Sequence, residues 1–124
     1  MKSVESLDVY NLGMDIAIDI YKMTEFFPKS EIFGLTSQMR RAAISITSNL
    51  SEGAARNTSG EYKHFVGISR GSAAELRSQV NISCKLGFID SKIHKNITEK
   101  LNQTCRMLTG LINSLSHTPA PTQE

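Results

Sequence analysis

Hydrophobic residues recur at steps of three and four in four separate stretches of this chain, which is the spacing of one face of an α-helix. No stretch shows the alternation of polar and apolar residues that marks a half-buried strand. Short connections between such helices favour antiparallel neighbours. The sequence therefore predicts an all-α fold, an antiparallel up-down-up-down four-helix bundle over residues 1–116 with a flexible tail at 117–124. The helices are expected at about 7–26, 36–56, 59–86 and 91–116.

The first of these segments has a wider apolar surface than one neighbouring helix would cover. One row of residues forms its expected core face: Val9, Leu12, Ile16, Ile20 and Met23. A second apolar row lies beside the first: Tyr10, Met14, Ala17 and Tyr21. Either this surface meets two other helices, or part of it is a contact between copies of the chain in an oligomer.

Residues with known preferences for helix ends mark several boundaries. Thr58 and Glu61 have the spacing of a capping box, in which each side chain bonds a free backbone amide at the helix start. Asp90 is a favourable N-cap for the fourth helix, and Gly87 stands where a left-handed residue commonly ends a helix. Pro28 ends the first helix, because the residue before a proline is driven out of helical geometry.

Two contacts between helices can be predicted from positions along the chain. Gly67 and Gly71 lie inside the third helix, where each costs about 1 kcal/mol relative to alanine, so we expect another backbone to approach closely there. Arg41 and Glu75 are each about 17 residues from the turn near Thr58, which places them at the same height on adjacent antiparallel helices. We therefore predict an ion pair between Glu75 and either Arg41 or Arg40.

The length and the cysteines limit the class of protein. A chain of 124 residues forms one domain with a real core. No apolar run approaches the roughly 20 residues of a spanning helix, and the N-terminal residues lack the apolar core of a signal peptide, so we expect a cytoplasmic location. Cys84 and Cys105 suit a reducing compartment. They would lie about 18 Å apart along adjacent helices, so a disulfide between them is not expected.

The residue types that carry catalysis are not arranged for it. Glu61 and His64 form one Glu-x-x-His step on a helix face, whereas di-metal bundles need two such steps and two further glutamates. The three histidines, at positions 64, 94 and 117, have no partner set that indicates a triad. A glycine-rich phosphate loop is also absent. The sequence favours a protein that is not an enzyme and has no metal or other cofactor.

The basic residues form a pattern although the net charge is only +2. Residues 1–31 hold six acidic and three basic residues, so the excess of positive charge lies in the rest of the chain. Lys63, Arg70 and Arg77 follow one another at seven-residue intervals, which forms a stripe along the third helix. The more common interpretation of such a stripe is a solvated flank or salt bridges between helices. The alternative is a row of cations for a phosphate backbone, with salt-sensitive and sequence-tolerant binding.

Several runs of the sequence resemble a known family. They are IYKMTEFFP at 20–28, FGLTSQMRRAAISITSNLSEG at 33–53, GSAAEL at 71–76 and LGFI at 86–89. Together they resemble the 23S rRNA-intervening-sequence family of bacterial four-helix-bundle proteins, and the resemblance extends from Leu7 to Leu115. Thr47 stands where many members have proline, and Ser51 where alanine is usual. These two departures are expected to alter the local bend of the second helix and not the fold.

The resemblance implies a bundle that assembles into a pentameric ring. It also implies similarity to the accessory variability determinant of diversity-generating retroelements, a basic barrel that binds nucleic acid and a reverse transcriptase. The family takes its name from genes found inside intervening sequences of ribosomal RNA. That name describes a genomic setting and does not supply a mechanism.

Together, the residues and the resemblance lead to a functional hypothesis. We expect a ring-forming homo-oligomer that binds RNA, DNA or a nucleic-acid enzyme through a basic surface. The candidate residues are Arg40, Arg41, Lys63, Arg70 and Arg77, with Arg56 and Lys85 flanking them. The alternative is a structural adaptor that binds only protein partners, and the small net charge of +2 favours this alternative.

Overall fold

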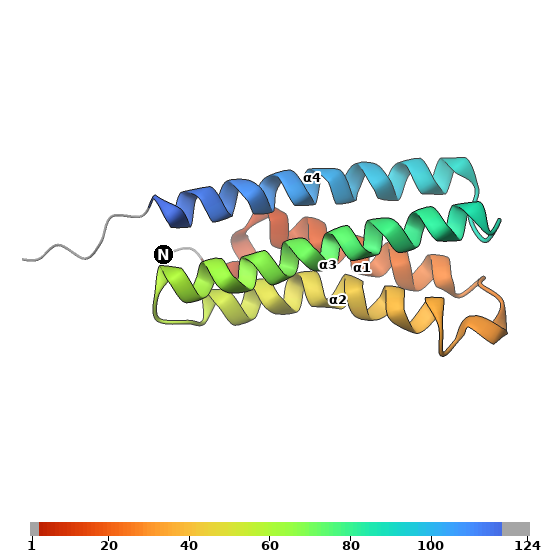
Figure 1. Ribbon diagram of the computed structural model, residues 1–124, viewed down its shortest axis with the longest axis horizontal. Helices are drawn as coiled ribbons and strands as arrows, with labels where there is room; N and C mark the ends of the chain where they lie inside the picture. The colour runs from red at the N-terminus through yellow and green to blue at the C-terminus, as the bar shows by residue number, and fades with distance from the viewer. Residues whose placement is uncertain (1–2, 118–124) are drawn as a thin grey trace, which may run out of the picture.

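A computed structural model describes residues 3–117 of the chain, and the four predicted helices form (Figure 1). Their bounds are α1 Asp8–Thr24, α2 Leu35–Ala54, α3 Ser59–Lys85 and α4 Ser91–Ser116. Two short 3-10 helices, η1 Val4–Ser6 and η2 Lys29–Glu31, precede α1 and α2. The described residues contain no strand, which confirms the all-α class. Of the predicted tail at 117–124, only His117 lies within the described residues.

The helices form an antiparallel bundle in which each helix packs against two neighbours. α2 contacts α1 and α3, and α4 contacts α3 and α1. The α1–α2 and α3–α4 connections lie at one end of the bundle, and the α2–α3 turn lies at the other end, near the N-terminus (Figure 1). Over residues 3–117, no helix combines the length and the apolar character needed to span a bilayer.

The core extends along the whole bundle and has two parts. The larger part takes one or more fully buried side chains from each helix, among them Ile16, Ile46, Leu76 and Leu101. The smaller part lies toward the α2–α3 turn and is formed by Val9, Leu50, Val66 and Leu108. These residues occupy the apolar stripes of the sequence, so the helical periodicity and the packing agree.

The predicted N-caps Thr58 and Asp90 form, whereas the Glu61 half of the predicted capping box does not, because the Glu61 carboxylate accepts from the Thr58 hydroxyl and not from a backbone amide. Thr58 Oγ1 accepts a hydrogen bond from the Glu61 amide at 3.1 Å, and Asp90 Oδ1 accepts one from the Ile93 amide at 2.8 Å. Gly87 ends the helical path of α3 with φ of 80°, which is the left-handed conformation that favours glycine. α1 and α2 both end two residues earlier than predicted, at Thr24 and Ala54.

The outer surface of α1 keeps several large apolar side chains in solvent. Met14, Ile18 and Tyr21 are 42%, 52% and 40% exposed. Tyr21 lies on the α2 side, because the Arg40 guanidinium stacks over its ring at 4.5 Å. One turn after Arg40 on α2, Ile44 is 43% exposed and extends the same surface. We call Met14, Ile18, Tyr21 and Ile44 the apolar outer face of α1 and α2.

The predicted ion pair between Glu75 and Arg41 or Arg40 is wrong. Among residues 3–117, ion pairs join Arg56 to Glu52 and Lys100 to Asp19. Arg40 turns toward α1 instead, where its Nε donates to Thr24 Oγ1 at 2.9 Å. The Glu75 carboxylate accepts a hydrogen bond at 3.2 Å from the side-chain Nε2 of Gln79, one turn later on the same helix. Equal height along the bundle was thus insufficient to predict the ion pair, because Arg40 and Glu75 each have another partner.

The expected close approach at Gly67 and Gly71 is also wrong. A methyl group added at either glycine would meet nothing within 4 Å. Close approach occurs at two other glycines. A Cβ at Gly13 would lie 2.9 Å from Thr47 Cγ2, and a Cβ at Gly53 would lie 2.9 Å from Phe65 Cβ. Gly13 lets α1 approach α2, and Gly53 admits the start of α3 against the end of α2.

Candidate nucleic-acid interface

The stripe of basic residues on α3 faces α4. Arg70 Nη1 donates to Thr109 Oγ1 at 3.2 Å, and Arg77 Nη1 donates to Asn102 Oδ1 at 3.0 Å. Lys63 is exposed. It lies seven residues before Arg70, and this spacing places it on the same side of α3 as Arg70 and Arg77. We call Lys63, Arg70 and Arg77 the cationic edge. At 1.5 Å per residue it extends over about 21 Å of α3.

A surface hollow lies beside the first half of this edge. It has a volume of about 510 Å³, and α3 supplies Lys63, His64 and Arg70 to its lining while α4 supplies Ile112. Gly60 and Gly67 also line it, so that no side chain projects from α3 at these two positions. The hollow is therefore shallow, open to solvent and bordered by positive charge.

The charge of the bundle is divided between its two sides. Within their helical bounds, α3 and α4 together hold eight basic and three acidic residues. α1 holds three acidic residues and one basic residue within its bounds. The net positive charge of the helices therefore lies mainly on α3 and α4.

The other predicted cations lie elsewhere. Arg56 pairs with Glu52 and stacks over the Phe65 ring at 4.8 Å, so its charge is partly used within the chain. Lys85 is exposed at the last residue of α3. Arg40 is held against α1, and Arg41 is exposed on α2. The structure thus brings together three of the seven candidate residues and separates Arg40 and Arg41 from them.

The groups considered for catalysis have ordinary structural partners. The Glu61 carboxylate accepts from the Thr58 hydroxyl at 3.1 Å, and the His64 ring packs against the Phe65 ring. Within residues 3–117, no three His, Cys, Asp or Glu side chains are grouped so as to hold a metal ion. Desolvation raises the pKa of the Tyr62 phenol above its ordinary value.

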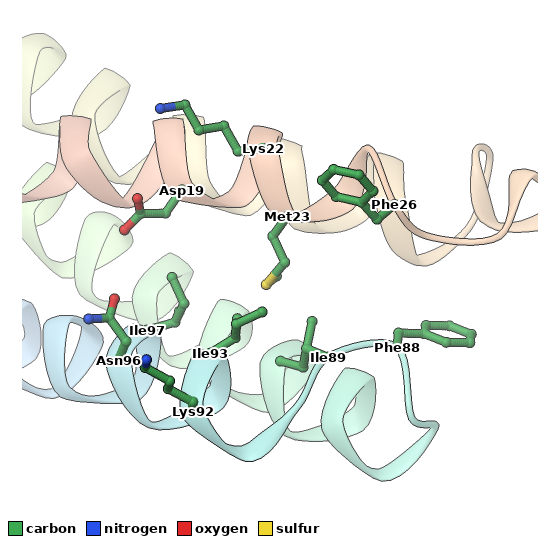
Figure 2. A pocket seen from close by; sticks show the side chains of 10 residues that line it. All are labelled: Asp19, Lys22, Met23, Phe26, Phe88, Ile89, Lys92, Ile93, Asn96 and Ile97. Carbon is green, nitrogen blue, oxygen red and sulfur yellow. The ribbon is translucent and has the colours of Figure 1, made fainter.

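A second concave site, between α1 and α4, was missed in the sequence. Figure 2 shows Met23 of α1 and Ile93 and Ile97 of α4 turned toward the space between the two helices. Phe26 and Phe88, from the two connections at this end, complete the site. The sequence pattern did not predict this site, because the site depends on the distance between α1 and α4. The run of apolar residues before Pro28 was interpreted only as a helix end.

Comparisons with known proteins agree with this architecture. Residues 5–110 match the family model described as 23S rRNA-intervening sequence protein. The fold is similar to that of a protein of unknown function from the S23 ribosomal protein family of Bacteroides thetaiotaomicron, with a TM-score of 0.78 and 17% identity over 84% of this chain and 97% of that chain. No curated protein matches the sequence. Because the family model spans most of the bundle, the chain belongs to the 23S rRNA-intervening sequence protein family.

Proposed function

We propose that this chain is a non-enzymatic, oligomeric bundle that binds the phosphate backbone of RNA or DNA along its cationic edge. The supporting observation is that the side chains bonded to the cationic edge are neutral. Arg70 and Arg77 are held by the neutral side chains of Thr109 and Asn102, and none of the three cations pairs with a carboxylate within residues 3–117. Their positive charge is therefore available to a ligand, in contrast to that of a salt-bridged flank.

The dimensions of the cationic edge suit backbone contact. Its length of about 21 Å corresponds to roughly six base pairs at 3.4 Å each. Three phosphate contacts give weak binding on their own at physiological salt. Several copies of the edge in one assembly would raise the overall affinity, because the later contacts become intramolecular.

The apolar outer face of α1 and α2 is the proposed contact between copies. Large apolar side chains that remain exposed as a group commonly mark a protein interface. This face lies on α1 and α2, whereas the cationic edge lies on α3 beside α4. The cationic edge therefore stays uncovered when the apolar outer face is buried. We therefore propose a homo-oligomer, with the pentameric ring implied by the family as its expected form.

Fluorescence anisotropy with an RNA hairpin, a single-stranded RNA and a DNA duplex, each across a salt series, tests the proposal. The expected result is affinity that falls steeply with salt for the two structured nucleic acids. In the triple variant Lys63→Gln, Arg70→Gln and Arg77→Gln, the slope of log affinity against log salt should decrease by about one unit for each lost phosphate contact.

The control Lys22→Gln with Lys29→Gln is compared with Lys63→Gln and Arg70→Gln, which makes the same change of charge. Both control lysines are exposed and lie outside the cationic edge and the other candidate cations. The control should leave the salt slope close to that of the unmodified protein. Equal slopes for the unmodified protein and the cationic-edge variant would reject the edge as the interface, and equal losses in both variants would show only a general effect of charge.

A second candidate is an adaptor that binds protein partners only. The apolar outer face of α1 and α2 and the net charge of only +2 favour it. The partner would then be a nucleic-acid enzyme, with a reverse transcriptase as the class that the family resemblance implies. In that case none of the three nucleic acids would bind, and purified enzyme of this class would bind the assembled protein directly.

A further inference from the structure

The groove between α1 and α4 has the properties of a small-molecule site. Its volume is about 660 Å³, within the range of about 300–1,000 Å³ typical of ligand pockets. Its floor is apolar and closed, since Met23, Ile89 and Ile97 are at most 9% exposed. Its rim is apolar but open, because Phe26 is 87% exposed and Ile93 is 41% exposed. A ligand seated on the floor would cover these two side chains.

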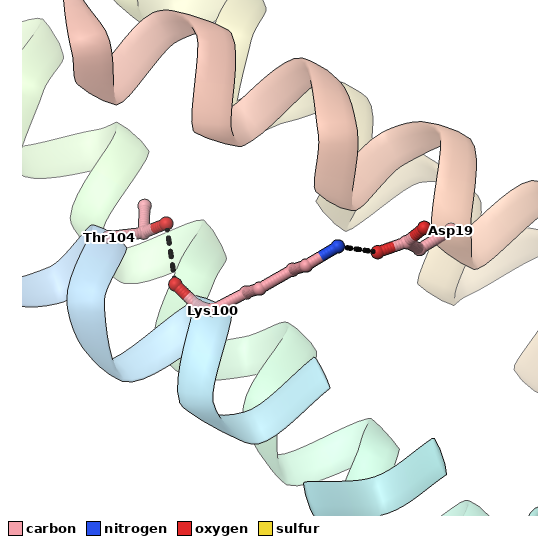
Figure 3. Close-up of polar contacts among 3 residues, drawn as sticks. All are labelled: Asp19, Lys100 and Thr104. Atoms are coloured by element: carbon pink, nitrogen blue, oxygen red, sulfur yellow. Dashed lines mark hydrogen bonds and ion pairs between the residues drawn. The ribbon is translucent and has the colours of Figure 1, made fainter. Parts of the chain in front are cut away.

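The charges around the groove favour an anion. Asp19 carries the negative charge in its lining, and Lys100 neutralises it through a contact of 2.6 Å between Nζ and Oδ2 (Figure 3). Lys22 on α1 and Lys92 on α4 also line the groove, one from each helix, and Figure 2 shows the Lys22 side chain directed away from α4. Neither lysine has an ion pair within residues 3–117. Two positive charges without an ion-pair partner in the described part of the chain thus lie beside the groove, and the Lys22 side chain has to turn inward to contact a ligand there.

We propose that this groove binds a small amphipathic carboxylate, with an unbranched apolar chain on the floor and an acidic head group between Lys22 and Lys92. The apolar chain gains by displacing water from Phe26, Ile93 and the floor residues. The lysine side chains are long and flexible, so their ammonium groups can turn toward the head group while their methylene stems stay on the rim. Met23 lies in the floor, where its unbranched side chain can adjust to the shape of the ligand.

Other occupants fit the groove less well. A cationic amphiphile would face two like charges, and Asp19 is already occupied by Lys100. A phosphate backbone lacks the apolar chain that this floor would accommodate. The site is also separate from the cationic edge, since it lies on the α1 side of α4 and the edge faces α4 from α3. Its occupancy can therefore be measured independently of nucleic-acid binding.

Three probes with ten-carbon chains and different head groups test the proposal by isothermal titration of the purified full chain. Decanoate should bind with 1:1 stoichiometry, decan-1-ol more weakly, and decyltrimethylammonium most weakly. The double variant Lys22→Gln and Lys92→Gln should weaken decanoate binding about tenfold, because two charge contacts from exposed lysines are lost. The same variant should change decan-1-ol binding by less than about twofold.

Two further variants keep the result interpretable. Ile93→Asp places a carboxylate in the groove at a partly exposed position, so it should abolish decanoate binding while the thermal unfolding midpoint confirms a folded protein. Lys29→Gln with Lys95→Gln removes the same charge from exposed positions that do not line the groove, and it should bind decanoate normally. Undiminished decanoate binding in Ile93→Asp overturns the proposal. Equal affinity for all three probes also overturns the proposal. So does absence of decanoate binding in a protein whose groove is covered by a second copy.

Discussion

The α1–α2 side and the α3–α4 side of the bundle are built differently, although both are pairs of adjacent antiparallel helices. α1 approaches α2 closely at Gly13 and leaves an apolar outer face. α3 meets α4 partly through hydrogen bonds from Arg70 and Arg77, and a Cβ added at its Gly67 or Gly71 would meet nothing within 4 Å. The first side has a close helix approach at one glycine and apolar side chains on its outer surface. The second keeps charge, and open space beside two glycines, at its outer surface.

Gly13→Ala tests the packed side and should have the largest effect on stability. The added methyl group would lie 2.9 Å from Thr47 Cγ2 and 3.3 Å from Ile46 Cγ2. Both neighbours are β-branched and have little rotamer freedom, so we expect a loss of about 2 kcal/mol in the free energy of unfolding. Urea unfolding measures it. As a control, Gly110→Ala in α4, where an added Cβ meets nothing within 4 Å, should be stabilising. A stabilised Gly13→Ala protein would show that α1 and α2 are less closely packed than described.

The double variant Gly67→Ala and Gly71→Ala tests the open side, where the sign should be opposite. Without any contact for the new methyl groups, the higher helix propensity of alanine should raise the free energy of unfolding by about 1–2 kcal/mol. The same urea titration measures the change. A destabilised double variant would mean that the fold uses the space at these glycines, and the contrast between the two sides would fail.

Ile18→Gln addresses the apolar outer face and should have the smallest effect on the stability of the single chain. Ile18 is 52% exposed, so the free energy of unfolding should change by less than about 0.5 kcal/mol. If copies associate through this face, sedimentation velocity should show that the variant shifts toward monomer. Ser78→Gln, at an exposed position on α3, is a suitable control and should leave the assembly unchanged. An unchanged assembly in the Ile18 variant would assign the contact to another surface.

The features that the sequence predicted correctly depend on neighbours along the chain. The helix starts at Thr58 and Asp90 and the left-handed Gly87 are each determined within a few residues. The row of Lys63, Arg70 and Arg77 follows from helical periodicity alone. Contacts between helices were harder to predict, because the angle and distance between two helices are set by all their facing side chains at once.

The incorrect predictions share this cause. Counting residues from the turn placed Arg41 and Glu75 at the same height along the bundle. It could not reveal that Arg40 bonds Thr24 and that Glu75 bonds Gln79. Glycine in a helix indicated a close approach somewhere, and the structure places it at Gly13 and not at Gly67. The groove between α1 and α4 had no counterpart in the sequence pattern, since its walls come from residues 19–26 and 88–97, which are far apart in the sequence.

The ion pair between Asp19 and Lys100 has a consequence for the order of folding. It joins residues 81 positions apart, whereas the buried hydrogen bond from Ser69 to the Ile46 carbonyl joins residues 23 apart. Closing a longer loop requires a larger loss of chain entropy. The α2–α3 hairpin can therefore form early, and the docking of α1 onto α4 completes the bundle. The same junction should open first in native-state fluctuations, so amide exchange would be faster along α1 and α4 than in the hairpin between them.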